Sequence, residues 1–176
     1  MKTQGYSFGA VILHWLMAVS ILFLFAKSWW MMSLPWGEAV RGFPFQLHKN
    51  LGLTLILVVG LLLYIRWKRS PGKLPQTMSG WMKTAAMADH ILLYTLILAV
   101  CVSGYLSSSY SGWGTTLWWL IELPNWGYEN DELNELYSDI HIYACWALLA
   151  VLAAHISGAL YHAFRRDGVV RRMLHL

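Results

Sequence analysis

Charged residues are scarce in this 176-residue chain, and cysteines are scarcer still. Only 12% of the residues are charged while 57% are hydrophobic, which lies outside the range of ordinary soluble domains. The two cysteines, Cys101 and Cys145, lie within apolar stretches, so a disulfide framework is not expected. Neither belongs to a C-x-x-C-H motif, which excludes covalent c-type haem attachment. Length and composition favour one compact membrane domain over residues 1–176.

Four apolar stretches are long enough to cross a hydrocarbon core of about 30 Å as helices of about 20 residues. We expect them near residues 8–30, 45–67, 89–110 and 137–164. No strand alternation competes, and helices satisfy the backbone within lipid. The sequence therefore predicts an all-α, integral membrane four-helix bundle. The first stretch has no small-residue cleavage site after it, so we expect a retained span and not a cleaved signal peptide.

The connections between these stretches differ in charge, and this predicts the orientation of the chain. The 66–88 link and the C-terminal tail are basic: Arg66, Lys68, Arg69, Lys73 and Lys83, then Arg165, Arg166, Arg171 and Arg172 against Asp167. Residues 111–136 contain no Lys or Arg but five acidic residues: Glu122, Glu129, Asp131, Glu132 and Glu135. The positive-inside rule then places both termini and the 66–88 link in the cytoplasm.

Tryptophans cluster near the predicted boundaries, as expected for an interfacial aromatic belt. They are Trp29, Trp30, Trp36, Trp67, Trp81, Trp113, Trp118, Trp119 and Trp126. The run TTLWWLIEL at 115–123 is predicted to lie on the outer surface as a short amphipathic helix.

Four histidines lie at matched depths inside the predicted spans. His14 is in the first, His48 in the second, and His141 and His155 share the fourth. The fourteen residues between His141 and His155 climb about 21 Å and return to within roughly 40° of the starting direction. Counting from the boundaries puts His14 and His155 toward the cytoplasm, and His48 and His141 toward the outside. Lipid makes ionisable side chains costly, so each is a functional candidate.

Two facing neutral imidazoles can hold the iron of a b-type haem, and the helices of a bundle can supply them. Gly52, Ala144 and Gly158 stand near these histidines and would admit a flat ring. The alternative for any single histidine is a hydrogen-bonded core residue. A zinc site is a second alternative, but one ion cannot bridge layers about 20 Å apart by helix rise. We also expect no carboxylate or thiolate to complete either layer.

Two further histidines are candidates for polar contacts at the cytoplasmic side. His90 stands at the start of the predicted third span and could contact a haem propionate or a quinone. His162, seven residues after His155, could contact a quinone headgroup. For both, an interfacial histidine without a ligand is the alternative. Other groups could offset propionate charge or contact lipid headgroups: Arg41 and Lys49 outside, Arg66 and Arg165 inside.

Four runs in order along the chain resemble the bacterial cytochrome b561 family, which is related to the cytochrome b subunits of nickel hydrogenases. They are LHWLMA (13–18), LHKNLG (47–52), DHILLY (89–94) and IHIYACWALLAVLAAHISGALYH (140–162). The resemblance covers essentially the whole chain, including RRML at 171–174. It implies a four-helix membrane bundle with two haem b groups. The implied axial pairs are His14 with His155 near the cytoplasm and His48 with His141 near the periplasm.

The resemblance also implies the function: single-electron transfer across the inner membrane between a periplasmic-side donor or acceptor and the ubiquinone pool. One member type is a superoxide oxidase that reduces ubiquinone, for which His162 would be a candidate quinone contact. The acidic 111–136 loop does not favour capture of an anion such as superoxide. We expect contacts with membrane lipid and no nucleic-acid partner.

Two alternatives remain open at this point. The first is a cytochrome b redox subunit that exchanges electrons with a partner protein docked on the acidic outer loop. The second is a membrane scaffold whose histidines are structural. Whether the chain is itself an enzyme, an oxidoreductase, also stays open; the sequence contains no nucleophile or acid–base pair that suggests hydrolytic or transfer chemistry.

Overall fold

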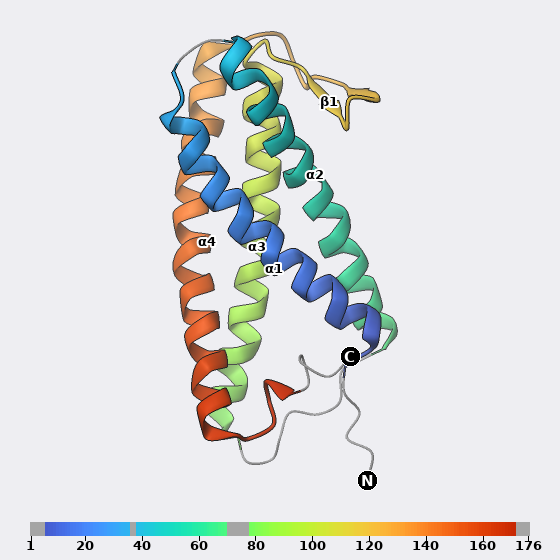
Figure 1. Ribbon diagram of the computed structural model, residues 1–176, viewed down its shortest axis with the longest axis vertical. Helices are drawn as coiled ribbons and strands as arrows, with labels where there is room; N and C mark the ends of the chain where they lie inside the picture. Colours follow the sequence, from blue (N-terminus) through green and yellow to red (C-terminus); the bar gives the residue numbers. More distant parts are fainter. Residues whose placement is uncertain (1–5, 36–37, 70–77, 172–176) are drawn as a thin grey trace.

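The computed structural model describes residues 6–35, 38–69 and 78–171, and within these ranges four helices carry the fold (Figure 1). They are α1 (Phe8–Ser33), α2 (Glu38–Lys68), α3 (Gly80–Tyr110) and α4 (Asp131–Arg165). All four are long and apolar enough to cross a membrane. The predicted four-helix membrane bundle is therefore confirmed.

The helices pack as two couples, α1 with α2 and α3 with α4. Figure 1 shows α3 and α4 side by side along most of their length, with α1 crossing the bundle obliquely. The point where α1 begins and the point where α4 ends lie at the lower end of this view. A hydrophobic core joins the helices, and its buried members come from all four: Ala10, Met17, Ile21, Leu24, Leu55, Val59, Leu62, Ile97, Cys101 and Leu148.

Three of the helices begin earlier than the sequence predicts. α2 starts at Glu38, α3 at Gly80 and α4 at Asp131, ahead of the expected 45, 89 and 137. For α4 the cause is a cap: the Asn130 side chain accepts a hydrogen bond from the Leu133 amide at 2.9 Å. Asp131 and Glu132 add negative charge at the positive end of the helix dipole. For α3, the stretch 80–88 contains one charged residue, Lys83, so little opposes continuation of the helix.

The amphipathic helix predicted at 115–123 is wrong, because this segment forms a β-hairpin. β1 (Thr115–Leu117) pairs antiparallel with β2 (Ile121–Leu123), with Thr116 opposite Glu122. The chain reverses through Trp118 and Trp119, which both have positive φ. Contacts with the bundle hold this unfavourable backbone in place: the Trp118 amide donates to Asn50 Oδ1 at 2.9 Å, and the Thr115 hydroxyl lies 2.9 Å from Ser108 Oγ.

Candidate functional site

His48 on α2 and His141 on α4 face each other near the hairpin end of the bundle, and we call them the upper pair. Their ring centroids are 6.2 Å apart and the ring planes are inclined at 76°. The His141 Nδ1–H group donates to the Val100 carbonyl on α3 at 2.8 Å. His48 Nδ1 lies 3.3 Å from Ser28 Oγ on α1. Because the Ser28 hydroxyl donates its proton to the Leu24 carbonyl at 2.7 Å, it accepts from His48.

His14 on α1 and His155 on α4 form the lower pair, toward the end where α1 begins. Their ring centroids are 6.3 Å apart and the planes are inclined at 54°. His155 Nδ1 donates to the carboxylate of Asp89 on α3, with 2.7 Å between Nδ1 and Oδ2. The structure thus brings the four histidines together in the two pairs that the sequence predicts. In three of the four rings Nδ1 is engaged with a neighbour, so Nε2 is the nitrogen left to bind a ligand.

Three glycines border the pairs in two different ways. A Cβ added at Gly104 on α3 would lie 2.9 Å from His141 Nδ1, so a side chain at this position would displace the imidazole. A Cβ added at Gly52 or Gly158 would meet nothing within 4 Å. The sequence singled out Gly52 and Gly158 for their spacing from the histidines. It missed Gly104, whose only signal is a glycine inside an apolar span.

A carboxylate stands in the lower layer, which contradicts the expectation that none would complete either layer. Asp89, His90 and His155 each offer a ligand atom, and these atoms lie within 4.8 Å of one another. The physical reason is the early start of α3 at Gly80, which carries Asp89 and His90 well into the helix and level with His155. Asp89 Oδ2 is closer to His155 Nδ1, at 2.7 Å, than to His90 Nδ1, at 3.7 Å.

His90 therefore lies beside the lower pair and not at the start of a span. Its ring centroid is 5.3 Å from that of His155, in an edge-on arrangement. Its Nδ1–H group donates to the Ala86 carbonyl, four residues earlier in α3, at 2.7 Å. The other nitrogen, Nε2, is then a hydrogen-bond acceptor in the neutral ring.

His162 lies in the last turn of α4, about 10 Å beyond His155 by helix rise. Its Nδ1 atom is 2.5 Å from Asp167 Oδ2, just past the helix end. Partial burial raises the pKa of Asp167, but hydrogen bonds from His162 and from the Val169 amide outweigh this effect and lower the pKa below its usual value. His162 is thus held by a carboxylate at the end of the bundle where α4 ends.

Several cations border the two layers. Lys27 on α1 is buried, and its Nζ donates to the carbonyl of Pro44, one helical turn before His48. Lys49 donates to the carbonyls of Trp113 and Gly114 at 3.2 and 3.3 Å. Toward the lower end, Arg66 donates to the Tyr94 hydroxyl at 2.7 Å. Arg165 is exposed, and the side chain of Arg41 lies outside the described residues.

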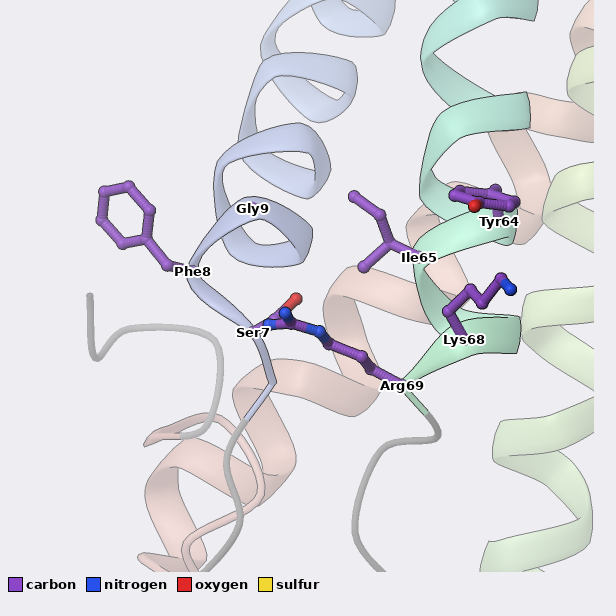
Figure 2. A pocket seen from close by; sticks show the side chains of 7 residues that line it. All are labelled: Ser7, Phe8, Gly9, Tyr64, Ile65, Lys68 and Arg69. Atoms are coloured by element: carbon purple, nitrogen blue, oxygen red, sulfur yellow. The ribbon is translucent and has the colours of Figure 1, made fainter.

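A separate pocket of about 330 Å³ lies where α1 begins and α2 ends (Figure 2). Figure 2 shows Arg69 reaching across toward Ser7, while Phe8 points away from α2. Ile65 and Tyr64 form part of its wall, and no histidine lines it. This pocket is therefore distinct from the histidine pairs.

Comparison with known proteins agrees with this geometry. A family model described as Prokaryotic cytochrome b561 matches residues 5–176. The chain is similar to "Cytochrome b561 homolog 2" of Escherichia coli (strain K12), with 28% identity over 175 residues, covering 97% of this chain and 92% of that protein. It is also similar to "Cytochrome b561 homolog 1" of the same organism, with 26% identity over 176 residues, covering 98% and 95%. The chain belongs to the prokaryotic cytochrome b561 family, and is a multi-pass b-type cytochrome of the bacterial inner membrane that transfers electrons.

Proposed function

We propose that this cytochrome holds two haem b groups, one between the imidazoles of His14 and His155 and one between those of His48 and His141. It would carry single electrons between a donor or acceptor at the outer face of the membrane and the ubiquinone pool. The observation that carries the proposal is the spacing of the rings in both pairs.

The spacing fits a metal ion between two imidazoles. Two nitrogens that each lie about 2 Å from a metal between them separate the ring centroids by about 6 Å. The observed separations are 6.2 Å in the upper pair and 6.3 Å in the lower pair. A Cβ added at Gly52 or Gly158 would meet no protein atom within 4 Å, so neither position obstructs a flat group at its level.

The protein's contribution is to orient the imidazoles and to exclude water, while each bound haem supplies a one-electron iron couple. Val100 and Asp89 hold the rings of His141 and His155 through Nδ1, which leaves Nε2 as the nitrogen for a metal. The two levels are about 21 Å apart along α4, which supports electron transfer from one half of the bilayer to the other.

The charge distribution supports an orientation with both termini in the cytoplasm. The described basic residues at the lower end are Arg66, Lys68, Arg69, Lys83, Arg165, Arg166 and Arg171. Exposed acidic residues instead follow the hairpin and occupy the first turns of α4. The positive-inside rule then puts the lower pair toward the cytoplasm and the upper pair toward the periplasm.

Ubiquinone would exchange electrons at the cytoplasmic level, with His90 and His162 as candidate contacts. His162 Nδ1 donates to Asp167, so Nε2 of the neutral ring is the atom available to accept from a quinol hydroxyl. His90 Nε2 is an acceptor, which suits a quinol hydroxyl better than a propionate oxygen. The adjacency of His90 to the lower pair favours it as the nearer contact.

The outer face supports a second candidate function, that of a redox subunit for a basic partner protein. Six carboxylates near the hairpin end are exposed: Glu122, Glu129, Asp131, Glu132, Glu135 and Asp139. Lys49, which could have attracted an anion, is turned onto the carbonyls of Trp113 and Gly114. This surface favours a cationic partner over superoxide, although superoxide oxidation with ubiquinone as acceptor remains a function to test.

Optical spectroscopy with a pyridine haemochrome assay tests the main proposal. We expect two haem b groups per chain and a low-spin spectrum. A colourless protein from haem-replete cells would refute the proposal and favour a structural role for the histidines. Stopped-flow mixing with superoxide then separates the two functions: rapid reduction with matching ubiquinone consumption supports the oxidase, whereas slow reduction favours the subunit.

A further inference from the structure

The two histidines that α4 contributes have different acceptors at Nδ1. His141 donates to a backbone carbonyl, that of Val100, at 2.8 Å. His155 donates to the carboxylate of Asp89 at 2.7 Å. On the facing helices, His48 has a neutral hydroxyl as its neighbour, that of Ser28 at 3.3 Å. The upper pair is thus bordered by neutral acceptors, while the lower pair carries an anionic one.

An anionic acceptor changes the properties of a metal-bound imidazole. A carboxylate that accepts the Nδ1–H bond makes the ring more basic, so the ring is a stronger donor to the metal. Stronger donation and a nearby negative charge both favour the oxidised metal, which carries the extra positive charge. A carbonyl has the same directional effect on the ring but no net charge. Asp89 therefore favours the oxidised state at the lower level only.

The upper pair lies near a buried positive charge, that of Lys27, whereas the lower pair lies near the negative charge of Asp89. The side chain of Lys27 is only 7% exposed, and its Nζ donates to the Pro44 carbonyl, which lies one turn from His48 in α2. A buried cation is screened weakly, so it favours the reduced state of a metal at the upper level. At the lower level, Arg66 is a nearby cation, but it donates to the Tyr94 hydroxyl, whereas Asp89 contacts His155 directly.

We propose that Asp89 is a positioning residue that makes the lower centre the one of lower reduction potential, so that an electron shared between the two levels resides mainly in the upper one. The inference rests on the proposed function, because it requires a metal held by each pair. It makes transfer from the quinone side toward the outer face the downhill direction between the two centres.

A potentiometric titration of the purified holoprotein, followed by haem absorbance, tests this inference. The wild-type protein should titrate in two one-electron waves, and His155→Ala, which keeps only the upper centre, assigns the higher wave. Asp89→Asn keeps an oxygen acceptor for Nδ1 and removes only the charge. We expect this substitution to raise the midpoint reduction potential of the lower centre by about 59 mV or more, which is a tenfold change in the equilibrium constant for one electron. The upper wave should stay in place.

Two further variants serve as controls. Asp89→Glu should keep the lower wave near its wild-type position because the charge is retained. Asp139→Asn removes an exposed carboxylate two residues before His141, and both waves should stay unchanged because solvent screens this charge. If Asp89→Asn fails to fold, Lys27→Gln provides the second test, since loss of the buried cation should lower the upper wave toward the lower one.

The inference is overturned if the wild-type lower centre titrates above the upper one. It is also overturned if Asp89→Asn retains both haems with an unmoved lower wave, or moves both waves equally. These results differ from a failure of the proposed function, which would appear as wild-type protein without haem, before any titration is possible.

Discussion

Gly104→Ala should weaken the upper haem site while leaving the lower site intact. The Cβ of alanine would lie 2.9 Å from His141 Nδ1 and 3.0 Å from Cε1, closer than carbon and ring atoms tolerate. The obstacle is the imidazole itself, which is fixed by its 2.8 Å hydrogen bond to the Val100 carbonyl. The ring must therefore move away from α3, and it loses part of that hydrogen bond as it does so.

The free-energy cost of Gly104→Ala can be estimated from substitutions that overpack protein interiors. An extra methyl group in a packed site costs about 1–3 kcal/mol. If this cost appears in haem binding, the affinity of the upper site falls by roughly 5- to 150-fold. The expected outcome is a preparation with between one and two haems per chain and a loss confined to the upper spectral component.

Gly60→Ala is the matched control, because it makes the same change within a helix. A Cβ at Gly60 on α2 would meet nothing within 4 Å, so no ring is displaced. The assay is haem per protein by pyridine haemochrome, with reductive titration to separate the two centres. Full occupancy in Gly104→Ala, with unchanged upper-site spectrum and potential, would refute the reasoning that the close approach of α3 fixes His141.

Three other substitutions test separate parts of the structure. His155→Ala should remove the lower haem and retain the upper one in the haemochrome assay; loss of both haems from folded protein would count against the pairing. His162→Ala should leave haem content near normal but slow quinol-dependent haem reduction, and an unchanged rate would exclude it as a quinone contact. Asn50→Ala deprives the Trp118 amide of its acceptor and should destabilise the protein by about 1–3 kcal/mol, measured as a lower melting temperature in detergent.

The helices and the two histidine levels could be predicted from the sequence because both depend on local regularities. Apolar runs of bilayer length specify the spans, and the fixed rise of a helix sets the distance between His141 and His155. In the structure His141 and His155 each face a different partner, with ring centroids 6.2 and 6.3 Å apart, so the two levels are separate. Residues on one helix or at one depth are related by geometry that needs no knowledge of packing.

Two features were not predicted from the sequence, the contact of Asp89 with His155 and the hairpin at 115–123, because both depend on residues far apart in the chain. Asp89 reaches His155 across 66 residues, from a position well inside α3, which begins at Gly80 instead of near residue 89. The hairpin at 115–123 has a helical pattern of apolar residues, yet Asn50 of α2 holds the Trp118 amide and favours a reversal of the chain. In both cases a polar side chain makes a contact with a residue far away in the sequence, which the local pattern does not encode.

The sharing of α4 by both levels has a consequence for how the sites can vary. His141 and His155 belong to one helix, so rotation of α4 would misalign both pairs together. Their partners, His48 and His14, stand on different helices, and each can adjust without disturbing the other level. Substitutions that act through α1 or α2 should therefore affect one centre, while those that rotate α4 against α3 should affect both. The close contact of Gly104 with His141 is one point where α3 fixes that rotation.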